Sequence, residues 1–336
     1  MLSLKKLSVL LLLFLTSLPV FAKQTLFVEP QAMQEPILNL IHQSRRQIDV
    51  VIYQFTDPVL IQALGQAEQR GVKVRVLFTS RTHGDYSSVT AAIKSFRDEG
   101  VEVKTSNPDF TYTHQKTFIF DDQQALISTG NMTFDHYPNT RNFMVLTDER
   151  EQVKQIAAVF EKDWLHQLPS LSPEALSRSQ LVWSPINADS SLVRLIDSAS
   201  SSLDIYALEM TDPDVVSALY RALDRGVRVT IIVSKDPFSW SRDCLLSLYD
   251  QGAKLQILGD DSPFIHAKAI LADSHRAFIG SENFTSNSLN KNRELGIITA
   301  DPGVIETLAS TLKQDMAAPH YPVSELVSGQ QPMALN

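Results

Sequence analysis

Two short stretches of the chain place a histidine, a lysine and an aspartate at the same spacing. They are "THQKTFIFDD", with His114, Lys116 and Asp121, and "IHAKAILADS", with His266, Lys268 and Asp273. Seventeen residues after each histidine comes an asparagine, Asn131 in "STGNMTF" and Asn283 in "GSENFTS". One such triplet is weak support for a function. Two copies in one repeat register, each followed by the same asparagine, are strong support.

Apolar residues follow each lysine, as in a strand that runs into a core. Side chains alternate along a strand, so His114 and Lys116 are expected to project to one face, about 7 Å apart. Phe118 and Phe120 then continue the strand into the core. Cationic side chains at the start of a buried strand predict that this end opens onto an anion-binding cleft.

The elements that must position these residues occur twice. "QIDVVIYQFTDPVLIQALGQAEQRGVKVRVLFTS" matches "SLDIYALEMTDPDVVSALYRALDRGVRVTIIVSK" at a displacement of 155 residues. From Glu99–Val101, which pairs with Gln251–Ala253, the displacement is 152, the same one that relates the two histidines. The chain is therefore an internal duplication, with three residues fewer in one loop of the second half.

Each half alternates strands and helices. An apolar, β-branched segment leads into Thr-Asp-Pro, an amphipathic helix, a glycine and a second Val-rich segment. Thr56 or Asp57 is expected to cap the helix, with Pro58 in its first turn and Gly71 at its end. This pattern predicts an α/β fold with sheets flanked by helices.

The expected domains follow from the duplication. A Ser- and Pro-rich stretch at 166–180 is expected to link the halves. The two domains are expected at residues 23–168 and 176–318, and residues 319–336 are expected to form a loose tail.

Residues 1–22 are expected to be a secretory signal peptide. Lys5 and Lys6 precede an apolar run from Leu7, and Val20-Phe21-Ala22 offers a cleavage site after Ala22. An uncleaved membrane anchor is the alternative, but the run is short for a span. We expect an exported protein, either periplasmic or secreted.

Charge and cysteine content limit which ligands and which kinds of stabilisation the protein can have. The formal net charge is -8, or about -10 without the leader, so net charge does not draw the protein to nucleic acid, although a local basic cleft is not excluded. A single cysteine, Cys244, rules out an intrachain disulfide, so packing must hold the fold. The chain has no cluster of carboxylates or of His and Cys that indicates a metal, and no cofactor is expected.

On its two motifs the chain resembles the phospholipase D superfamily. The resemblance extends from about Gln47 to Asp301 and rests on the doubled His-x-Lys-x4-Asp pattern. It implies two repeats, each a mixed β-sheet flanked by helices, related by a pseudo-twofold axis. One active site is then expected at their interface, so a monomer can be complete.

The resemblance also implies roles. One histidine attacks phosphorus to form a phosphohistidine, and the other protonates the leaving alcohol and then activates water. By analogy with two-motif members, His114 is expected to be the nucleophile and His266 the general acid and base. The residues expected to bind the non-bridging phosphate oxygens are Lys116, Lys268, Asn131 and Asn283.

Carboxylates near the motifs are expected to support these groups. In the family the motif aspartate is usually structural, so Asp121 and Asp273 are placed outside the layer that touches substrate. A carboxylate that orients each histidine is also expected, and "NRELGII" supplies Glu294, whereas the equivalent position in "TRNFMVL" is Asn142. We expect Glu294 to support whichever histidine acts as the acid, or another acid such as Asp135 to replace the missing carboxylate.

Two further pairs have alternatives that the sequence leaves open. Arg141 and Arg293 align at the 152-residue displacement and are either phosphate contacts or strand-edge salt bridges. Phe238 and Trp240 form either an exposed loop that touches a membrane or part of the packed interior.

The sequence therefore predicts a metal-independent phosphodiesterase with a covalent histidine intermediate. A phospholipid at a membrane surface is the expected substrate, because an exported acidic protein lacks the basic charge that helps to hold nucleic acid. An exported nonspecific endonuclease is the alternative within the superfamily. A catalytically silent phosphate-binding module is the alternative of another class.

Overall fold

The computed structural model describes residues 24–84, 86–135 and 137–324. The predicted signal peptide lies outside the described residues, as does most of the predicted tail. Among the described helices, none has the length and apolar character needed to cross a membrane.

The first repeat is a mixed sheet with the strand order β1-β7-β6-β5-β2-β3-β4. Strands β2, β3 and β4 are parallel, and β5, β6, β7 and β1 join them as antiparallel neighbours. The strands are β1 (Gln24–Glu29), β2 (Gln47–Ile52), β3 (Lys73–Phe78), β4 (Glu102–Thr105), β5 (Thr117–Phe120), β6 (Gln124–Ser128) and β7 (Thr140–Thr147). The helices are α1 (Glu35–Gln43), α2 (Pro58–Gln69), α3 (Ser87–Asp98), the 3-10 turn η1 (Tyr137–Asn139) and α4 (Arg150–Trp164).

The second repeat has the same strand order, with one additional strand at its edge. Its order is β16-β11-β10-β9-β13-β14-β15-β8. The strands are β8 (Leu181–Ser184), β9 (Ser202–Tyr206), β10 (Arg228–Ser234), β11 (Lys254–Leu258), β13 (Ala269–Ala272), β14 (Arg276–Gly280), β15 (Glu294–Thr299) and β16 (His320–Tyr321). The helices are α6 (Ala188–Ser198), α7 (Pro213–Asp224), α8 (Lys235–Trp240), α9 (Arg242–Asp250), α10 (Ser286–Asn290) and α11 (Pro302–Met316). The predicted fold of two α/β repeats is confirmed.

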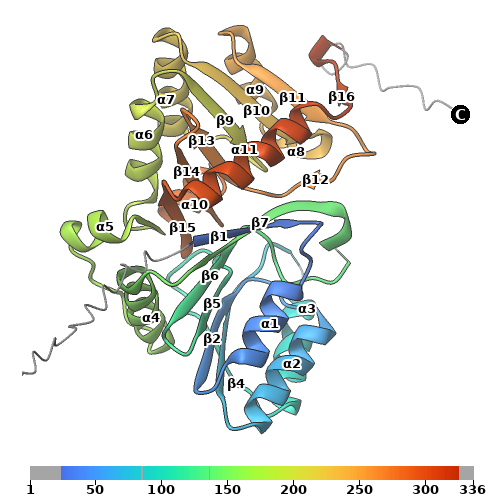
Figure 1. Cartoon of the computed structure of the whole chain (residues 1–336), viewed down its shortest axis with the longest axis vertical. Helices are drawn as coiled ribbons and strands as arrows, with labels where there is room; N and C mark the ends of the chain where they lie inside the picture. The colour runs from blue at the N-terminus through green and yellow to red at the C-terminus, as the bar shows by residue number, and fades with distance from the viewer. Residues whose placement is uncertain (1–23, 85, 136, 325–336) are drawn as a thin grey trace, which may run out of the picture.

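Helices cover the outer face of each sheet, and the inner faces share a core. Figure 1 shows α1, α2 and α3 on one side of the first sheet and α6, α7 and α9 on the far side of the second. Buried residues of both sheets, among them Val51, Phe143 and Ile232, pack with α4 and α11 into one cluster. The two repeats are therefore joined by a continuous apolar interior.

The repeated Thr-Asp-Pro turn caps a helix in each half. The Oδ1 atom of Asp57 accepts hydrogen bonds from the backbone of Val59 and Leu60, at 2.8 and 3.3 Å, so Asp57, and not Thr56, is the N-cap. Asp212 caps α7 in the same way. Gly71 follows the C-terminus of α2 at φ +89°, a conformation that favours glycine.

Two segments differ from the sequence-based expectation. The predicted linker at 166–180 contains a short helix, α5 (Pro173–Ser179), because Ser172 accepts a cap hydrogen bond from Ala175 and Pro173 occupies its first turn. The predicted loose tail contains β16, which pairs with β11 through Tyr321 and His320. An unpaired edge of β11 accounts for this short addition.

Candidate active site

The segment before each histidine crosses to the other repeat. The backbone nitrogens of His114 and Gln115 donate to the carbonyl oxygen of Arg293, and those of His266 and Ala267 donate to that of Arg141. Just before His266, the short strand β12 (Phe264–Ile265) pairs in parallel with the start of β7. We expected the histidines within strands, but β5 and β13 begin only after the lysines, because the preceding residues pair across the interface.

Buried ion pairs hold these crossings in place. Arg141 of the first repeat pairs with Asp315 of α11 at 2.8 Å, and Arg293 of the second pairs with Asp163 of α4 at 2.9 Å. Asp315 follows Asp163 by 152 positions, so the two pairs are equivalent. Of the two alternatives for these arginines, the structure shows salt bridges.

His114 is held by a carboxylate from the other repeat. Its Nδ1 atom lies 2.8 Å from Oε2 of Glu294, which is fully buried. A carboxylate only accepts, so Nδ1 bears the ring proton and Nε2 the lone pair. Burial, followed by the charge of Lys116, lowers the pKa of His114 to about 4 against the opposing effect of Glu294. His114 is therefore neutral at pH 7.

Glu294 is ionised despite its burial. Contacts with His114 and Lys116 and a hydrogen bond from Ser288 lower its pKa against the desolvation that raises it. Its other oxygen accepts hydrogen bonds from Ser288 at 2.6 Å and Asn292 at 2.8 Å. We expected Glu294 to support the acid histidine, and we expected His266 to be that acid. Glu294 contacts His114 instead, so these two expectations do not hold together.

Each motif lysine contacts the backbone carbonyl of the histidine two residues before it. Lys116 Nζ donates to the carbonyl oxygen of His114 at 2.5 Å, and Lys268 Nζ to that of His266 at 2.6 Å. Lys268 Nζ also lies 3.3 Å from Nδ1 of His266, and its charge lowers the pKa of His114. Lys268 thus contacts His266 and also lowers the pKa of His114.

Both lysines are fully buried, which disfavours their charged form. Burial lowers the pKa of Lys268 to about 7, opposed by Glu294, Glu209 and Glu282. It lowers the pKa of Lys116 well below its usual value, opposed mainly by Glu294. An anionic ligand can supply the missing counter-charge, as expected for a phosphate site.

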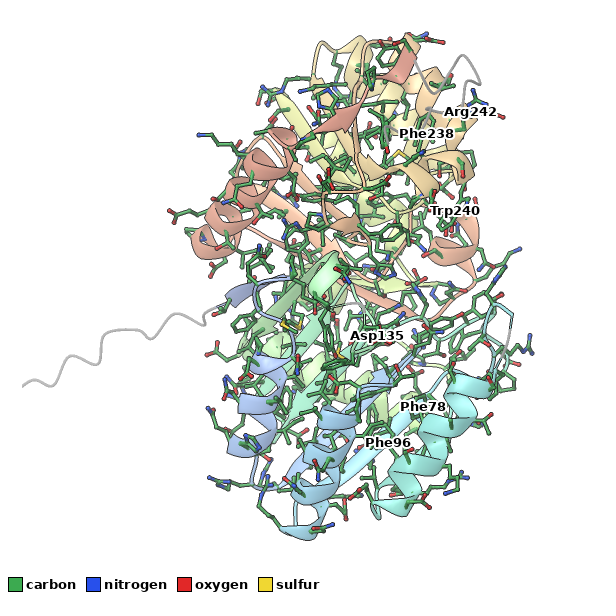
Figure 2. All side chains as sticks on the ribbon, turned by 90° about the vertical axis from the view of Figure 1, so that its right-hand side faces the viewer. Phe78, Phe96, Asp135, Phe238, Trp240 and Arg242 are labelled. Carbon is green, nitrogen blue, oxygen red and sulfur yellow. The ribbon has the colours of Figure 1, made fainter. Side chains whose placement is uncertain are left out.

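An amide, in place of a carboxylate, contacts His266. Its Nδ1 atom lies 3.0 Å from Oδ1 of Asn142, again from the other repeat. The hydroxyl of Thr129 donates to the same oxygen at 2.9 Å, and Asn142 Nδ2 donates to Thr140 at 3.0 Å. Asp135, which we expected as a substitute acid, is exposed (Figure 2).

A cavity of about 610 Å³ opens beside His114. Asn283 lines it, and so do Tyr53, whose ring meets His114 edge-on at 5.0 Å, and Glu209. Asn131 hydrogen-bonds Gln54 at 3.4 Å, and within the described chain the Oδ1 atoms of Asn131 and Asn283 have no partner. The side-chain amides of both asparagines therefore keep hydrogen-bonding capacity that the described residues do not use.

The motif aspartates lie at the far ends of their strands. Asp121 accepts hydrogen bonds from the backbone of Arg45, Arg46 and Gln47. Asp273 accepts from the backbone of residues 200–202 in the same manner. These bonds lower the pKa of both carboxyl groups against desolvation. Such contacts fit the supporting role expected of them.

Sequence reasoning missed several acidic residues around the site. Glu282 is fully buried, its charge affects Lys116 and Lys268, and burial followed by Glu294 raises its pKa well above the usual value. Glu209 lines the cavity, and burial raises its pKa. The one available signal is the difference between the repeats. The second repeat has acids at Glu282 and Glu209, where the first repeat has Gly130 and Gln54.

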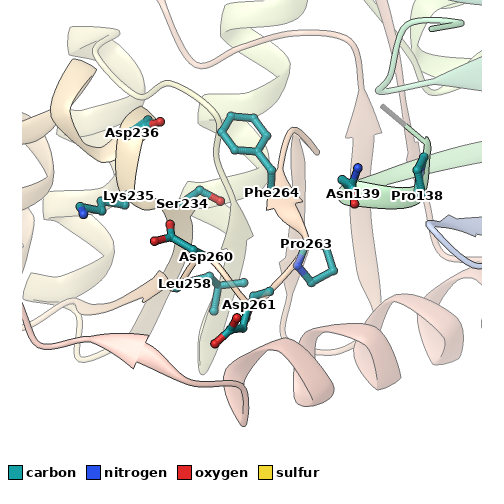
Figure 3. A pocket seen from close by; sticks show the side chains of 12 residues that line it. Pro138, Asn139, Ser234, Lys235, Asp236, Leu258, Asp260, Asp261, Pro263 and Phe264 are labelled. Atoms are coloured by element: carbon teal, nitrogen blue, oxygen red, sulfur yellow. The ribbon is translucent and has the colours of Figure 1, made fainter. Parts of the chain in front are cut away.

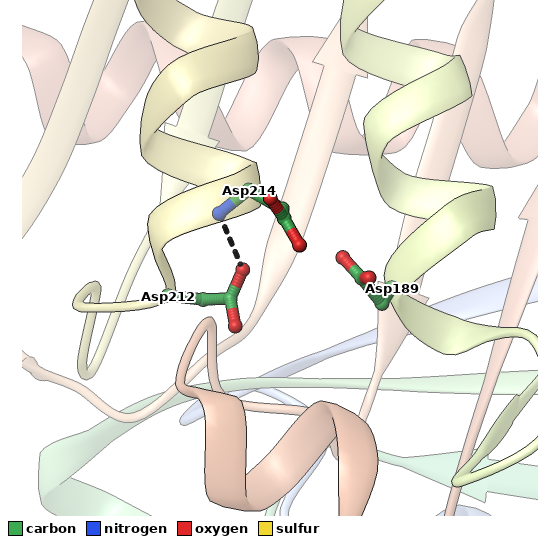
Figure 4. Close-up of side chains that lie close together, drawn as sticks. All are labelled: Asp189, Asp212 and Asp214. Carbon is green, nitrogen blue, oxygen red and sulfur yellow. Dashed lines mark hydrogen bonds between the residues drawn. The ribbon is translucent and has the colours of Figure 1, made fainter.

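A second hollow and a cluster of aspartates lie apart from the histidines and lysines described above. A hollow of about 430 Å³ is lined by Lys235, Asp236, Asp260 and Asp261, among others (Figure 3). Carboxylate oxygens of Asp189, Asp212 and Asp214 lie within 4.8 Å of one another (Figure 4). Helix capping by Asp212 already accounts for part of this cluster.

The aromatic pair in "KDPFSWSRD" is divided. Phe238 is buried within the core of the second repeat, whereas Trp240 is 56% exposed at the end of α8 (Figure 2). Phe134, three residues after Asn131, is also exposed. Of the pair Phe238 and Trp240, only Trp240 is therefore exposed.

Comparisons with known proteins match both repeats. The family described as "Cardiolipin synthase, PLD-like domain" matches residues 37–164 and 192–316. Cardiolipin synthase 2 of Bacillus cereus is 26% identical over 321 residues, which cover 83% of this chain and 62% of the relative. Human mitochondrial cardiolipin hydrolase is 29% identical over 129 residues, 38% of this chain and 49% of that protein. The chain thus spans less than two thirds of either relative.

Solved structures share the fold. A phosphatidylserine synthase of Haemophilus influenzae superposes with a TM-score of 0.69 at 13% identity and covers 88% of this chain and 86% of its own. A polyphosphate kinase from Porphyromonas gingivalis gives a TM-score of 0.67 at 18% identity, covering 93% and 53%. At these identities the likeness concerns the fold alone.

Proposed function

Since the chain belongs to the PLD-like domain family of the phospholipase D superfamily, we propose that it is a phosphodiesterase that cleaves the head-group phosphodiester of phospholipids. One observation supports this most strongly. Each histidine is oriented by a residue of the other repeat, and Lys268 acts on both. Two imidazoles and two lysines thus serve one site.

His114 is the proposed nucleophile. Its Nε2 atom attacks phosphorus, a P–N bond forms, and the P–O bond to the head group breaks. The lone pair on Nε2 is supported by the Nδ1 contact with Glu294, and the lowered pKa of His114 keeps the ring unprotonated at pH 7. The ionised Glu294 also stabilises the positive charge that the ring acquires in the phosphohistidine.

His266 is the proposed general acid and base. It donates a proton to the leaving alcohol, which typically contributes about 10² to 10⁴ in rate. In the second step it takes a proton from water, the water oxygen attacks phosphorus, and the P–N bond breaks to release phosphatidic acid. An alcohol in place of water gives transfer in place of hydrolysis.

Lys116, Lys268, Asn131 and Asn283 are proposed to bind the non-bridging oxygens. Charge on these oxygens increases in the five-coordinate transition state, and fixed donors in a buried site stabilise it strongly. The residues of this set require no metal ion for that role.

The cavity favours a phospholipid over nucleic acid. Apart from the buried Lys116 and Lys268, which are not part of its lining, no Lys or Arg is found among the described residues that line it, whereas binding of nucleic acid depends on several such contacts to successive phosphates. Tyr53, Tyr112 and Leu208 provide apolar surface in the same lining. The exposed Trp240 and Phe134 add apolar groups that a membrane can contact.

Trapping the intermediate tests the chemistry. Quenching in alkaline denaturant, which preserves the acid-labile P–N bond, during turnover of a ³²P-labelled phospholipid is expected to leave label on the wild-type protein and none on His114→Ala. A matched His266→Ala variant is expected to form the labelled species more slowly, because the leaving alcohol is not protonated, and to retain it longer, because water is not activated. If substrate turns over but no variant retains label, the covalent route is wrong. If the wild type turns over no substrate at all, the result favours the catalytically silent binding module.

A direct comparison tests the substrate. Phosphatidylcholine vesicles, cardiolipin vesicles and single-stranded DNA are offered separately in the presence of a chelator. We expect turnover of at least one lipid and none of DNA. Cleavage of DNA alone would favour the endonuclease and leave the histidine mechanism in place.

We also propose that the protein is exported and that cleavage follows Ala22. The first described strand begins at Gln24, so this cut leaves the fold intact. Intact mass of the protein from a periplasmic or secreted fraction is expected to correspond to a chain that begins at Lys23. A mass that includes residues 1–22 would contradict cleavage.

A further inference from the structure

The two repeats place a carboxyl group on opposite members of the same cross-strand pair. In the second repeat Glu294 of β15 lies opposite Ser184 of β8. In the first repeat Asn142 of β7 lies opposite Glu29 of β1. Ser184 follows Glu29 by 155 positions and Glu294 follows Asn142 by 152, the two displacements that relate the repeats. The carboxyl group missing at position 142 is therefore present on the neighbouring strand.

Glu29 is an unusual interior residue. It is 1% exposed, and in the part of the chain that the structure describes its Oε2 atom has no hydrogen-bond partner. Asn142 lies opposite it on β7, close enough for its side-chain amide to lower the pKa of Glu29 against the effect of burial. Arg141 donates to the backbone carbonyl of Glu29 at 2.6 Å, not to its carboxyl group. A buried carboxyl group without an ion pair is costly and calls for a reason.

We propose that Glu29 is a positioning residue for His266 and acts through the side-chain amide of Asn142. This inference rests on the proposed function, in which His266 transfers a proton. One amide hydrogen of Asn142 goes to Thr140 and its Oδ1 accepts from Thr129. A carboxyl oxygen of Glu29 accepts the second amide hydrogen and adds to these contacts in keeping Oδ1 turned toward Nδ1 of His266. Nδ1 then bears the ring proton, and Nε2 is the nitrogen that exchanges a proton with substrate.

His266 needs such support because two groups compete at Nδ1. Lys268 Nζ lies 3.3 Å away and, as a donor, favours an unprotonated Nδ1. Asn142 Oδ1, at 3.0 Å, favours a protonated one. A hydrogen bond from the amide to Glu29 polarises Asn142 and strengthens Oδ1 as an acceptor. Glu294 has no need of this help, because a carboxylate only accepts.

The protonation state of Glu29 gives the proposal a second readout. Burial raises the pKa of Glu29 to about 8, opposed by the hydrogen bond from Asn142. The titratable groups that face it are Tyr137 and Arg141, with Asp315 behind Arg141. At pH 7 Glu29 therefore accepts mainly as the neutral acid, and above pH 8 as a carboxylate.

Two substitutions at Glu29 separate shape from function. Glu29→Leu removes the acceptor, and we expect kcat to fall about tenfold, as is typical for residues that orient a catalytic group. KM should stay unchanged, because Glu29 does not line the cavity. Glu29→Gln retains an acceptor and should keep kcat within about threefold of the wild type at pH 7. Its kcat should fall behind only above pH 8, where Glu29 of the wild type becomes a carboxylate and glutamine stays neutral.

Exchanging the pair provides a rescue. Glu29→Ser with Asn142→Glu reproduces, in the first repeat, the Ser184 and Glu294 pair of the second. The double variant is expected to exceed Asn142→Glu alone in kcat by about tenfold or more, because the single variant sets two carboxyl groups opposite each other. Equal activity of the double and single variants would contradict the proposal.

A spectroscopic measurement tests the inference independently of turnover. The ¹⁵N shifts of the His266 ring are expected to report a protonated Nδ1 in the wild type and a mixture of tautomers in Glu29→Leu. Ser184→Ala is the matched control, since the Ser184 hydroxyl has no partner among the described residues and Glu294 is held by Ser288 and Asn292. It should change neither the shifts nor kcat.

The outcomes distinguish the two levels of the argument. If Glu29→Leu leaves both the tautomer and kcat unchanged, or if Ser184→Ala causes the same loss, the positioning role is wrong. If the wild type cleaves no phosphodiester but the tautomer of His266 still shifts in Glu29→Leu, the proposed function fails and the positioning role stands.

Discussion

Glu294 and Asn142 occupy equivalent positions but give their histidines different electrostatic partners. Glu294 is ionised and lies 2.8 Å from His114, whereas the amide of Asn142 lies 3.0 Å from His266. A carboxylate stabilises a cationic ring, and an amide does so only weakly. In the proposed mechanism, the ring that bears a positive charge throughout the covalent intermediate is thus the one with the carboxylate. This asymmetry supports His114 as the nucleophile.

Glu294→Gln tests this assignment at the level of one atom. The substitution keeps the shape of the side chain but removes its charge and permits the wrong tautomer of His114. We expect kcat to fall by about 10² or more, by analogy with the loss seen when the orienting aspartate of a catalytic triad becomes an amide. The phosphoenzyme yield measured by alkaline quenching should fall in parallel. Asn142→Ala is the comparison, and its effect should appear in hydrolysis of the intermediate.

The pKa values of His114 and Lys268 predict the pH dependence of kcat/KM. His114 must be neutral to attack, and its pKa is lowered to about 4. Lys268 must be charged to bind phosphate, and its pKa is lowered to about 7. Because kcat/KM reports the free enzyme, we expect a plateau between these values and a tenfold loss per pH unit beyond each.

Lys268→Arg provides the control for the alkaline limb. A guanidinium group stays protonated, so the fall above pH 7 should move to higher pH even if absolute activity drops. An alkaline limb that is identical in wild type and Lys268→Arg would assign it to another group.

The sequence identified the chemical groups of the site better than their partners. The doubled motif was sufficient to propose His114, Lys116 and their counterparts, although both histidines precede the strands in which they were expected. The partner of Glu294 was not predictable in this way, since His114 lies 180 positions away and the contact forms only when the repeats dock. The same holds for Glu29, whose role depends on the register of β1 against β7.

At the scale of elements, the crossing segments depend on the buried pairs Arg141–Asp315 and Arg293–Asp163. Asp315 also accepts a hydrogen bond from the hydroxyl of Tyr206 at 2.6 Å. Asp315→Ala leaves the Arg141 guanidinium, 3% exposed, without its counter-ion. We expect the free energy of unfolding to fall by about 3–5 kcal/mol, measured by denaturant titration, with loss of activity because the carbonyl of Arg141 holds the backbone of His266.

A double variant shows whether charge or packing is responsible. Arg141→Met with Asp315→Leu replaces both ions by apolar groups, which is often neutral or stabilising in an interior. We expect it to recover most of the lost stability. A double variant as unstable as Asp315→Ala would show that the hydrogen bonds, and not the isolated charge, are decisive.

The periodic parts of the elements were predictable and their ends were not. Apolar β-branched runs and the Thr-Asp-Pro turn identified β2, α2 and β3 together with their repeats. The start of β5 at Thr117 was missed because His114 gives its backbone hydrogen bond to the other repeat. Similarly, β16 is two residues long and exists only because β11 offers an edge, which no local pattern reveals.

At the scale of the whole molecule, the two repeats of one chain contribute both histidine segments to a single interface. Segments before both histidines cross to the opposite repeat, and the equivalent ion pairs bind from α4 and α11. The cluster that joins both sheets has a continuous apolar interior. Separating the repeats to exchange them with another molecule would expose this interior, at about 25 cal/mol for each Å² of apolar surface. Exchange between chains should therefore be very slow.

This geometry predicts that inactive variants cannot rescue each other. An equimolar mixture of His114→Ala and His266→Ala contains every catalytic residue, but each chain lacks one histidine within its own interface. We expect the mixture to remain as inactive as its components when phospholipid turnover is measured over a wide range of protein concentration. If one site were instead assembled between two chains, a mixed dimer could combine both intact motifs and recover a substantial fraction of wild-type activity. Such recovery, increasing with concentration, would show that the interface between repeats forms in trans.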